Sequence, residues 1–275
     1  MALNHTHTLY DNFVLANEIE DQFNSMLDLA RFVKVDRSLV GTAGDTVKIH
    51  VYRATDGTEQ LEMGKGNTKN ITVSYAPEEY KIILLQNRFP YYDEEAMKDP
   101  MLIPTGLRHM ATDMFNESNK KIMAEFSKTS RSVNATSYNF DAFVDAVAQL
   151  SLPEAVDNGK EVFAFINPLQ KAEVRKDLKD DLKSVEAFAR TGYVGTVAGV
   201  NLYTKNDAPT DHIIVATEDA VTYFVKTGTE VEQVTAGNRS ETAANVRLNT
   251  IFSRKYFIPA LTDESQAVKI VKQTV

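Results

Sequence analysis

A histidine pair near the N-terminus is the first feature of this 275-residue chain that could do chemistry. His5 and His7 are one residue apart, and two imidazoles at this spacing on an extended arm could bind a metal ion. A disordered terminus is the favoured interpretation of the pair. His50, His109 and His212 are scattered, and no carboxylate or cysteine spacing near them resembles a ligand set.

A glycine–lysine tract and an acidic cluster are two further candidates. Residues 64–69 read GKGNTK, but they lack the G-x-x-x-x-G-K-[ST] spacing of a phosphate loop and join two expected strands. We therefore predict a hairpin tip there. Asp93, Glu94 and Glu95 could bind a divalent cation, or they could simply favour the positive N-terminal end of the helix that follows.

The rest of the chain gives no reason to propose catalysis. It contains no cysteine, and no G-x-S-x-G, H-E-x-x-H or paired-carboxylate signature stands out. We therefore predict a protein that is not an enzyme and needs no cofactor. The 43% hydrophobic fraction is ordinary for a globular protein with a real core.

The net charge of −8 and the absence of long apolar segments restrict the partners. No basic patch of the kind that grips phosphate backbones is visible, so sequence-specific nucleic-acid binding is not expected. No run of about 18 apolar residues occurs, and the N-terminus lacks a secretion signal. We predict a soluble product made in the cytoplasm, with no membrane partner.

The longest helical pattern runs from Met101 to about Ser127 and organises the elements around it. At about 1.5 Å per residue it predicts a spine of about 38 Å, with Pro100 and Pro104 at its start, where proline is tolerated. The apolar positions that share one face are Ile103, Leu107, Met110, Met114, Ile122 and Phe126.

Residues 45–88 predict a long β-hairpin. Residues 46–54 alternate apolar and polar side chains, a polar glycine-bearing loop follows, and residues 71–89 return as a strand. An isolated hairpin is only marginally stable in water, so its arms need a surface. A neighbouring copy of the same protein is the expected surface.

The remaining pattern is mixed α+β. Before the hairpin we expect an arm with a short helical stripe from Leu15 to Ala30. After the spine we expect a helix capped by Asn139 or Asp141, a buried strand at 160–168, and a charged helix started by Asn167-Pro168. Strands separated by turns, including one at Gly228, then complete the chain.

This ordered set resembles the major capsid protein of tailed bacteriophages, with the Hong Kong 97-like fold. The resemblance covers about Asn12 to Val271, and its most specific piece is the glycine-punctuated run from Gly195 to Asn206. It implies an icosahedral shell of hexamers and pentamers that encloses double-stranded DNA in the virion. The implied divisions are an N-terminal arm at 1–44, an extended hairpin loop at 45–88, a peripheral domain with the spine helix at 89–135 and 229–262, and an axial domain at 136–228 and 263–275.

The resemblance also implies contacts and partners. Intersubunit contacts are expected from two loops, namely Asp56, Gly57, Met63 and Lys65 at the hairpin tip and Asn206, Asp207 and Pro209 in the axial domain. A portal protein is an expected partner. Because only some 30 residues precede the first strand, a separate scaffolding protein, or none, is expected in place of a cleaved N-terminal segment. Packaged DNA would be enclosed without sequence-specific binding, and the acidic balance suits an inner wall that does not trap DNA.

Some members of the family crosslink a hairpin lysine to a peripheral asparagine, for which Lys65 and either Asn245 or Asn249 are the positions to consider. Two other functions stay open from the sequence. One is an encapsulin-type compartment, in which the stripe from Leu15 to Leu27 would dock cargo. The other is a monomeric soluble enzyme or binding protein.

Overall fold

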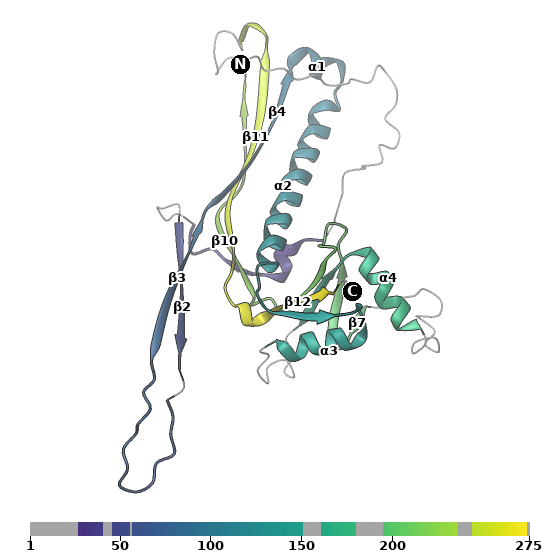
Figure 1. Cartoon of the computed structure of the whole chain (residues 1–275). Coiled ribbons are helices and arrows are strands. Elements are labelled where there is room, and N and C mark those ends of the chain that lie inside the picture. Colours follow the sequence, from purple (N-terminus) through teal and green to yellow (C-terminus); the bar gives the residue numbers. More distant parts are fainter. Residues whose placement is uncertain are drawn as a thin grey trace.

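The computed structural model is an elongated molecule with three parts (Figure 1). A long sheet with the spine helix forms one end, a second sheet with two helices lies beside the base of the spine, and a thin hairpin projects away from both. The structure describes residues 27–40, 46–55, 57–150, 161–179, 195–235 and 244–273.

The first part is a four-stranded sheet in the order β1-β10-β11-β4. Its strands are β1 (Lys34–Asp36), β4 (Ile83–Tyr92), β10 (Val221–Val234) and β11 (Leu248–Leu261). The helix α2 (Leu102–Phe126) lies along the sheet, and the short helix α1 (Asp93–Lys98) joins β4 to it (Figure 1). The predicted spine at 101–127 is therefore confirmed.

The packed side of α2 differs from the predicted stripe at one position. Met110, Met114, Ile122 and Phe126 are buried, whereas Leu107 is 38% exposed. The neighbouring Gly106 is buried instead, and a Cβ added there would lie 2.5 Å from the ring of Phe89. The helix approaches β4 so closely at this turn that the contact needs a residue without a side chain.

Gly228 does not form the predicted turn. β10 runs through it as one strand of 14 residues, paired antiparallel with β11. The register shifts between Val225 and Thr227 and again between Thr227 and Glu230, so the glycine lies in an irregular, bulged stretch. An isolated glycine inside a strand pattern is typical of such a bulge.

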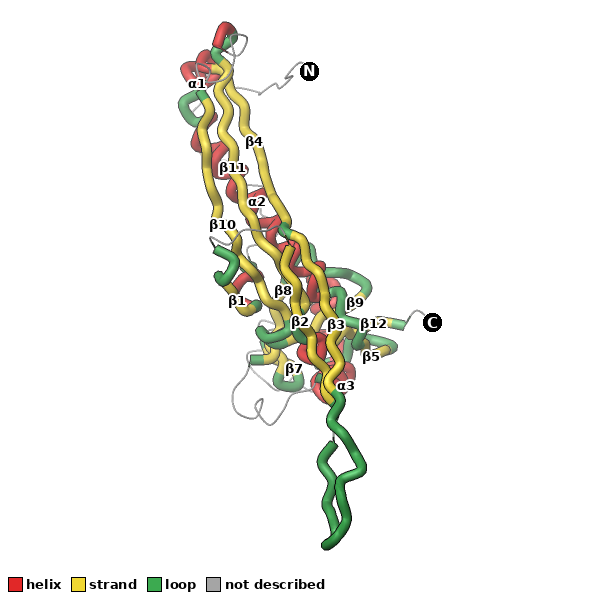
Figure 2. The backbone as a smooth tube through the Cα atoms, turned by 90° about the vertical axis from the view of Figure 1, so that its left-hand side faces the viewer, coloured by secondary structure: helices red, strands yellow, loops and turns green. Residues whose placement is uncertain are grey.

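The hairpin consists of β2 (Thr46–Ala54) and β3 (Val73–Lys81), paired antiparallel along their whole lengths. The predicted hairpin is confirmed, but its returning strand is shorter than expected. The strand is interrupted at Ile82, and the chain continues as β4, which pairs with β11. Both views show the hairpin extending beyond the rest of the molecule (Figures 1 and 2).

The second sheet has six strands in the order β5-β12-β9-β6-β8-β7. The strands are β5 (Ser132–Ala135), β6 (Val162–Ile166), β7 (Thr196–Val197), β8 (Val200–Thr204), β9 (His212–Ala216) and β12 (Ala267–Lys272). The helices α3 (Phe140–Gln149) and α4 (Pro168–Asp177) belong to this unit. Asn139 and Asn167 cap these helices, as predicted, by accepting backbone N–H bonds.

β6 shows how the two units share a core. All five of its residues are buried. Val162, Ala164 and Ile166 pack in a cluster with α3 and α4, while Phe163 and Phe165 pack with Phe126 of the spine. Alternate side chains of a strand point to opposite faces, so one strand supports a core on each side.

The start of the described chain packs into the second of these clusters. The 3-10 helix η1 (Leu29–Phe32) places Leu29 and Phe32 there, and Asn119 of α2 bonds to the backbone of Leu27 and Leu29 at 3.1 Å each. A second short 3-10 helix, η3 (Glu264–Gln266), precedes β12. The helical stripe predicted from Leu15 lies mostly outside the described residues. None of the described helices is both long and apolar enough to cross a membrane.

Candidate assembly interface

The hairpin tip, residues 57–72, continues the hairpin without forming strands. Thr55 and Thr72 close its base. The Thr55 amide donates to the Thr72 carbonyl oxygen at 3.0 Å, the Thr72 amide donates to Thr55 Oγ1 at 3.0 Å, and the two hydroxyls are 2.7 Å apart. Side-chain bonds therefore add to the backbone pairing where the tip begins.

Glu59 and Thr68 join the two arms further out. The Glu59 carboxylate accepts the Thr68 amide at 2.9 Å and the Thr68 hydroxyl at 2.8 Å. These bonds favour the ionised form, so they lower the pKa of Glu59, the backbone bond from Thr68 having the largest effect. The ionised carboxylate thus links the two arms of the tip, which are not paired as β-strands at this point.

Two glycines allow the tip to be narrow and to turn. A Cβ added at Gly57 would lie 2.6 Å from Ile71 Cγ1 and 2.8 Å from the Ile71 backbone nitrogen. Gly64 has φ of +85°, a conformation that favours glycine. The turn beside it is closed by the Lys65 amide, which donates to the Glu62 carbonyl oxygen at 3.1 Å, and by an exposed Lys65–Glu62 ion pair of 2.8 Å.

The tip also presents apolar side chains to solvent. Met63 is fully exposed at its end. The other large apolar side chains exposed along the tip and the start of β3 are Leu61, Ile71 and Val73. A thin protrusion that shows this much apolar surface is suited to packing against another molecule.

The predicted contact residues fall in two separate places. Gly57, Met63 and Lys65 lie in the tip, and Asp56 lies outside the described residues. Asn206, Asp207 and Pro209 lie in the loop between β8 and β9, within the second unit. One subunit therefore does not bring the two groups together, as expected for contacts made with different neighbours.

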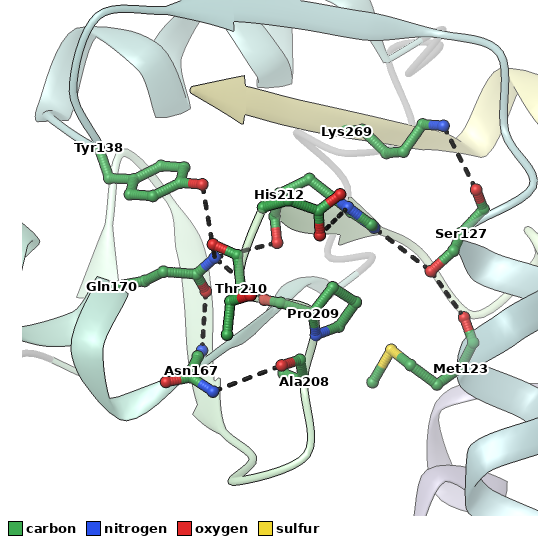
Figure 3. A network of polar contacts seen from close by, with 11 residues as sticks. Met123, Ser127, Tyr138, Asn167, Gln170, Ala208, Pro209, Thr210, His212 and Lys269 are labelled. Atoms are coloured by element: carbon green, nitrogen blue, oxygen red, sulfur yellow. Dashed lines mark hydrogen bonds and ion pairs between the residues drawn. The ribbon is translucent and has the colours of Figure 1, made fainter. Parts of the chain in front are cut away.

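The loop at 205–211, which we call the axial loop, is held by side chains at the start of α4 (Figure 3). Gln170 is buried, and its amide nitrogen donates to the backbone oxygens of Pro209, Thr210 and His212 at 3.1–3.2 Å. Asn167 bonds to the Asn206 carbonyl oxygen at 3.1 Å. The capping residues of the helix thus also fix the path of the loop.

Sequence reasoning found Asn167 as a cap but missed Gln170. The available signal was its position three residues after the cap, because a glutamine there completes a capping box. The Gln170 side-chain oxygen accepts the backbone N–H of Asn167 at 2.9 Å. The side-chain NH2 group of Gln170 is then left to donate to the loop.

Lys205, which lies in the axial loop, is a second residue that sequence reasoning missed. It is 1% exposed and pairs with Asp207, whose side chain reaches the surface. A buried ammonium needs such a partner, since an unpaired buried charge is costly. The pair therefore ties the exposed turn at Asn206 and Asp207 to the interior.

The acidic cluster has a structural role at a helix start. Asp93, Glu94 and Glu95 form the first turn of α1, and the Glu95 carboxylate accepts the Tyr92 amide at 3.0 Å. Within the described ranges, no group of three or more His, Asp or Glu side chains is placed to hold a metal ion.

The residues considered for a crosslink are also separated within one subunit. Lys65 is at the hairpin tip, whereas Asn249 is buried in β11 with its amide donating to the Asp93 carboxylate. Asn245 is exposed just before β11. A crosslink between the tip and either asparagine would have to join different subunits.

Comparison with known proteins connects this architecture to phage capsids. No model of a protein family matches the chain. The chain is 23% identical over 269 residues to the major capsid protein of Staphylococcus phage phiMR11, which covers 94% of this chain and 92% of that protein. The capsid structure of cyanophage P-SCSP1u matches it with a TM-score of 0.70 at 14% identity, over 100% of this chain and 92% of that one. The chain has the fold of a phage major capsid protein.

Further structures share this capsid fold. A chain of Mycobacterium phage Che8 matches with a TM-score of 0.69 at 14% identity, over 98% of this chain and 97% of that one. A capsid of an empty GTA particle matches with a TM-score of 0.68 at 13% identity, over 91% and 97% of the two chains. The α+β capsid fold expected from the sequence is thereby confirmed.

Proposed function

We propose that this protein is a phage major capsid protein, a structural subunit without catalytic function whose copies close into the icosahedral head. The capsid fold and the projecting hairpin support the proposal. In the virion the shell would consist of hexamers and pentamers and would enclose double-stranded DNA.

The hairpin is the single observation that carries the proposal. Its two strands pair only with each other among the described residues, and its tip projects beyond the rest of the molecule (Figure 1). A two-stranded sheet of this kind is marginally stable alone, because it buries little apolar area. Packing across an adjacent copy would cover Met63 and its apolar neighbours.

The expected contacts follow from this arrangement. The tip, with Asp56, Gly57, Met63 and Lys65, would lie on the adjacent subunit. The axial loop, with Asn206, Asp207 and Pro209, would meet its equivalents around hexamer and pentamer centres. The arm at 1–44, hairpin at 45–88, peripheral domain at 89–135 and 229–262, and axial domain at 136–228 and 263–275 are the proposed divisions.

The partners follow from the same proposal. A portal protein would occupy one vertex, and a separate scaffolding protein would guide assembly in the host cytoplasm. The net charge of −8 suits a container that holds DNA without gripping it, because repulsion lets the polymer slide during packaging. A strongly basic inner wall in a structure of the assembled particle would contradict this point.

Deleting residues 55–70 tests the assembly function. We expect a folded subunit, because the deletion removes no residue of the three buried core clusters of the described chain. The deletion should abolish closed shells, seen as the loss of megadalton particles in size-exclusion chromatography and in negative-stain images. The matched control is Glu62→Gln, which removes an exposed ion pair at the tip and should still give shells. Normal particles from the deletion variant would refute the role given to the hairpin.

A further inference from the structure

The spine unit and the six-stranded sheet are connected at one place, which we call the joint. Three stretches of chain cross between them, namely 127–131 after α2, 217–220 between β9 and β10, and 262–266 before β12. These crossings bond to one another. The Thr262 amide donates to the Ala220 carbonyl oxygen at 2.9 Å, and the Thr217 amide donates to the Gln266 carbonyl oxygen at 3.1 Å.

The C-terminal end of the spine helix is held in the joint by two side chains of the six-stranded sheet (Figure 3). Ser127 caps α2, and its hydroxyl donates to the Met123 carbonyl oxygen at 3.0 Å. The same hydroxyl is 3.3 Å from His212 Nε2, and the Ser127 carbonyl oxygen accepts Lys269 Nζ at 3.3 Å. A cation at this end also suits the negative end of the helix dipole.

His212 connects the C-terminal end of the spine helix with other parts of the six-stranded sheet unit. It is the first residue of β9, and its side chain is only 13% exposed. Its Nδ1 is 2.9 Å from the Asp211 carboxylate, and the bond between them lowers the pKa of Asp211. Its backbone oxygen accepts the side-chain amide of Gln170, so the histidine contacts the spine through Ser127, the axial loop through Asp211 and α4 through Gln170.

The hydrophobic contact across the joint brings the two units together. Phe126 packs edge-on against Phe163 at 6.0 Å and Phe165 at 5.6 Å between ring centroids. Ring pairs have preferred geometries, whereas the hydrophobic attraction itself is non-directional and depends on buried area. Hydrogen bonds weaken steeply when their angles change, and the polar groups of the joint therefore restrict rotation.

We propose that Ser127, His212 and Lys269 are positioning residues that set the angle between the spine helix and the six-stranded sheet, and thereby the curvature of the assembled shell. The inference rests on the proposed function, because curvature has meaning only for assembled subunits. In that function the hairpin contacts one neighbour and the axial loop contacts others. The angle between the units that carry these contacts determines how sharply the shell bends and hence its diameter.

The test measures particle diameters by cryo-electron microscopy for wild-type protein, Ser127→Ala and His212→Ala. Ser127→Ala removes one hydroxyl and is the variant least able to disturb folding. We expect both variants to form closed particles whose diameters shift or spread into more than one class, with thermal unfolding of the unassembled subunit close to wild type. His109→Ala, a histidine of α2 remote from the joint in sequence, is the matched control and should keep the wild-type diameter.

A conservative pair separates positioning from general stability. Lys269→Arg retains a donor for the Ser127 carbonyl oxygen and should keep one diameter, whereas Lys269→Met removes the donor and should not. Wild-type diameters from Ser127→Ala, His212→Ala and Lys269→Met would overturn the inference and leave the proposed function intact. A folded Ser127→Ala subunit that forms no particles would also overturn it, because lost contacts differ from altered curvature. Failure of the wild-type protein to form shells when it is produced together with its scaffolding protein would instead refute the proposed function.

Discussion

The six-stranded sheet and the hairpin are stabilised in opposite ways. Every residue of β6 is buried, and its alternate side chains pack into two separate cores. The hairpin tip has Met63 fully exposed and is held by bonds among exposed groups such as Thr55, Glu59 and Thr68. The six-stranded sheet therefore carries the stability of the subunit, while the hairpin carries a shape that needs a partner.

The hydrogen bonds of the tip give it shape at little gain in stability. An exposed bond exchanges with water, so its net contribution is small. Restricting the tip before it meets a neighbour nevertheless lowers the entropy lost on contact. Changes in the sheet should therefore unfold the subunit, and changes in the tip should impair assembly alone.

The largest effect on stability is expected from Phe165→Ala. The side chain is fully buried and packs against Phe126, so the change should lower the free energy of unfolding by about 3–5 kcal/mol. Denaturant titration of the unassembled subunit measures it. Met63→Ser is the counterpart at the tip and should leave the unfolding midpoint unchanged while reducing shell yield. Equal destabilisation by the two variants would break the comparison.

Gln170→Ala should come next. It leaves the part-buried backbone oxygens of Pro209 and His212 without their donor, which should cost about 1 kcal/mol in the free energy of unfolding. The matched control is Leu169→Ala, because Leu169 is the preceding residue of α4 and is exposed. A loss no larger than that of the control would show that the capping box does not hold the loop.

Gly57→Ala should have almost no effect on unfolding of the subunit, with a change below about 0.5 kcal/mol. Its added Cβ would collide with the backbone of Ile71, so the arms of the tip should be forced apart and shell yield should fall. Gly66→Ala is the control, since an added Cβ there meets nothing within 4 Å. Particle yields from the two variants, compared by size-exclusion chromatography, decide the prediction.

The smallest effect concerns the pH dependence of the tip. Bonds from Thr68 lower the pKa of Glu59 in the folded protein. The link between the ionised Glu59 carboxylate and Thr68 is therefore fully present above the ordinary glutamate pKa of about 4.3. It should be lost as the pH falls through the lowered value. Hydrogen exchange of the Thr68 amide should then accelerate beyond its intrinsic pH dependence. Glu59→Gln retains an acceptor that does not titrate and should remove the extra acceleration.

Local sequence pattern was sufficient to predict the elements whose determining residues lie close together in the chain. The spine helix followed from apolar residues at helical spacing, and the caps at Asn139 and Asn167 followed from residue type and position. The ordered set of elements, with the run from Gly195 to Asn206, was specific enough to indicate the capsid fold. These features depend on the backbone geometry of one segment or on element order.

The errors arose where a distant segment decides the local structure. Leu107 was placed in the packed stripe because the pattern cannot show that Phe89 approaches Gly106 at that turn. Gly228 was assigned to a turn because only pairing with β11 carries the strand through it. Ile82 ends β3 because the chain changes its partner there, from β2 to β11.

The candidate interface divides in the same way. Residue order was enough to indicate a thin glycine-bearing protrusion and an exposed turn at Asn206 and Asp207, since each is a continuous stretch of polar and small residues. The bond between Glu59 and Thr68, the grip of Gln170 on three backbone oxygens and the meeting of Ser127 with His212 required the folded coordinates. Such contacts join polar groups, which hydrophobic periodicity does not describe. They form only after the core around Phe126 and Phe165 has brought distant segments together.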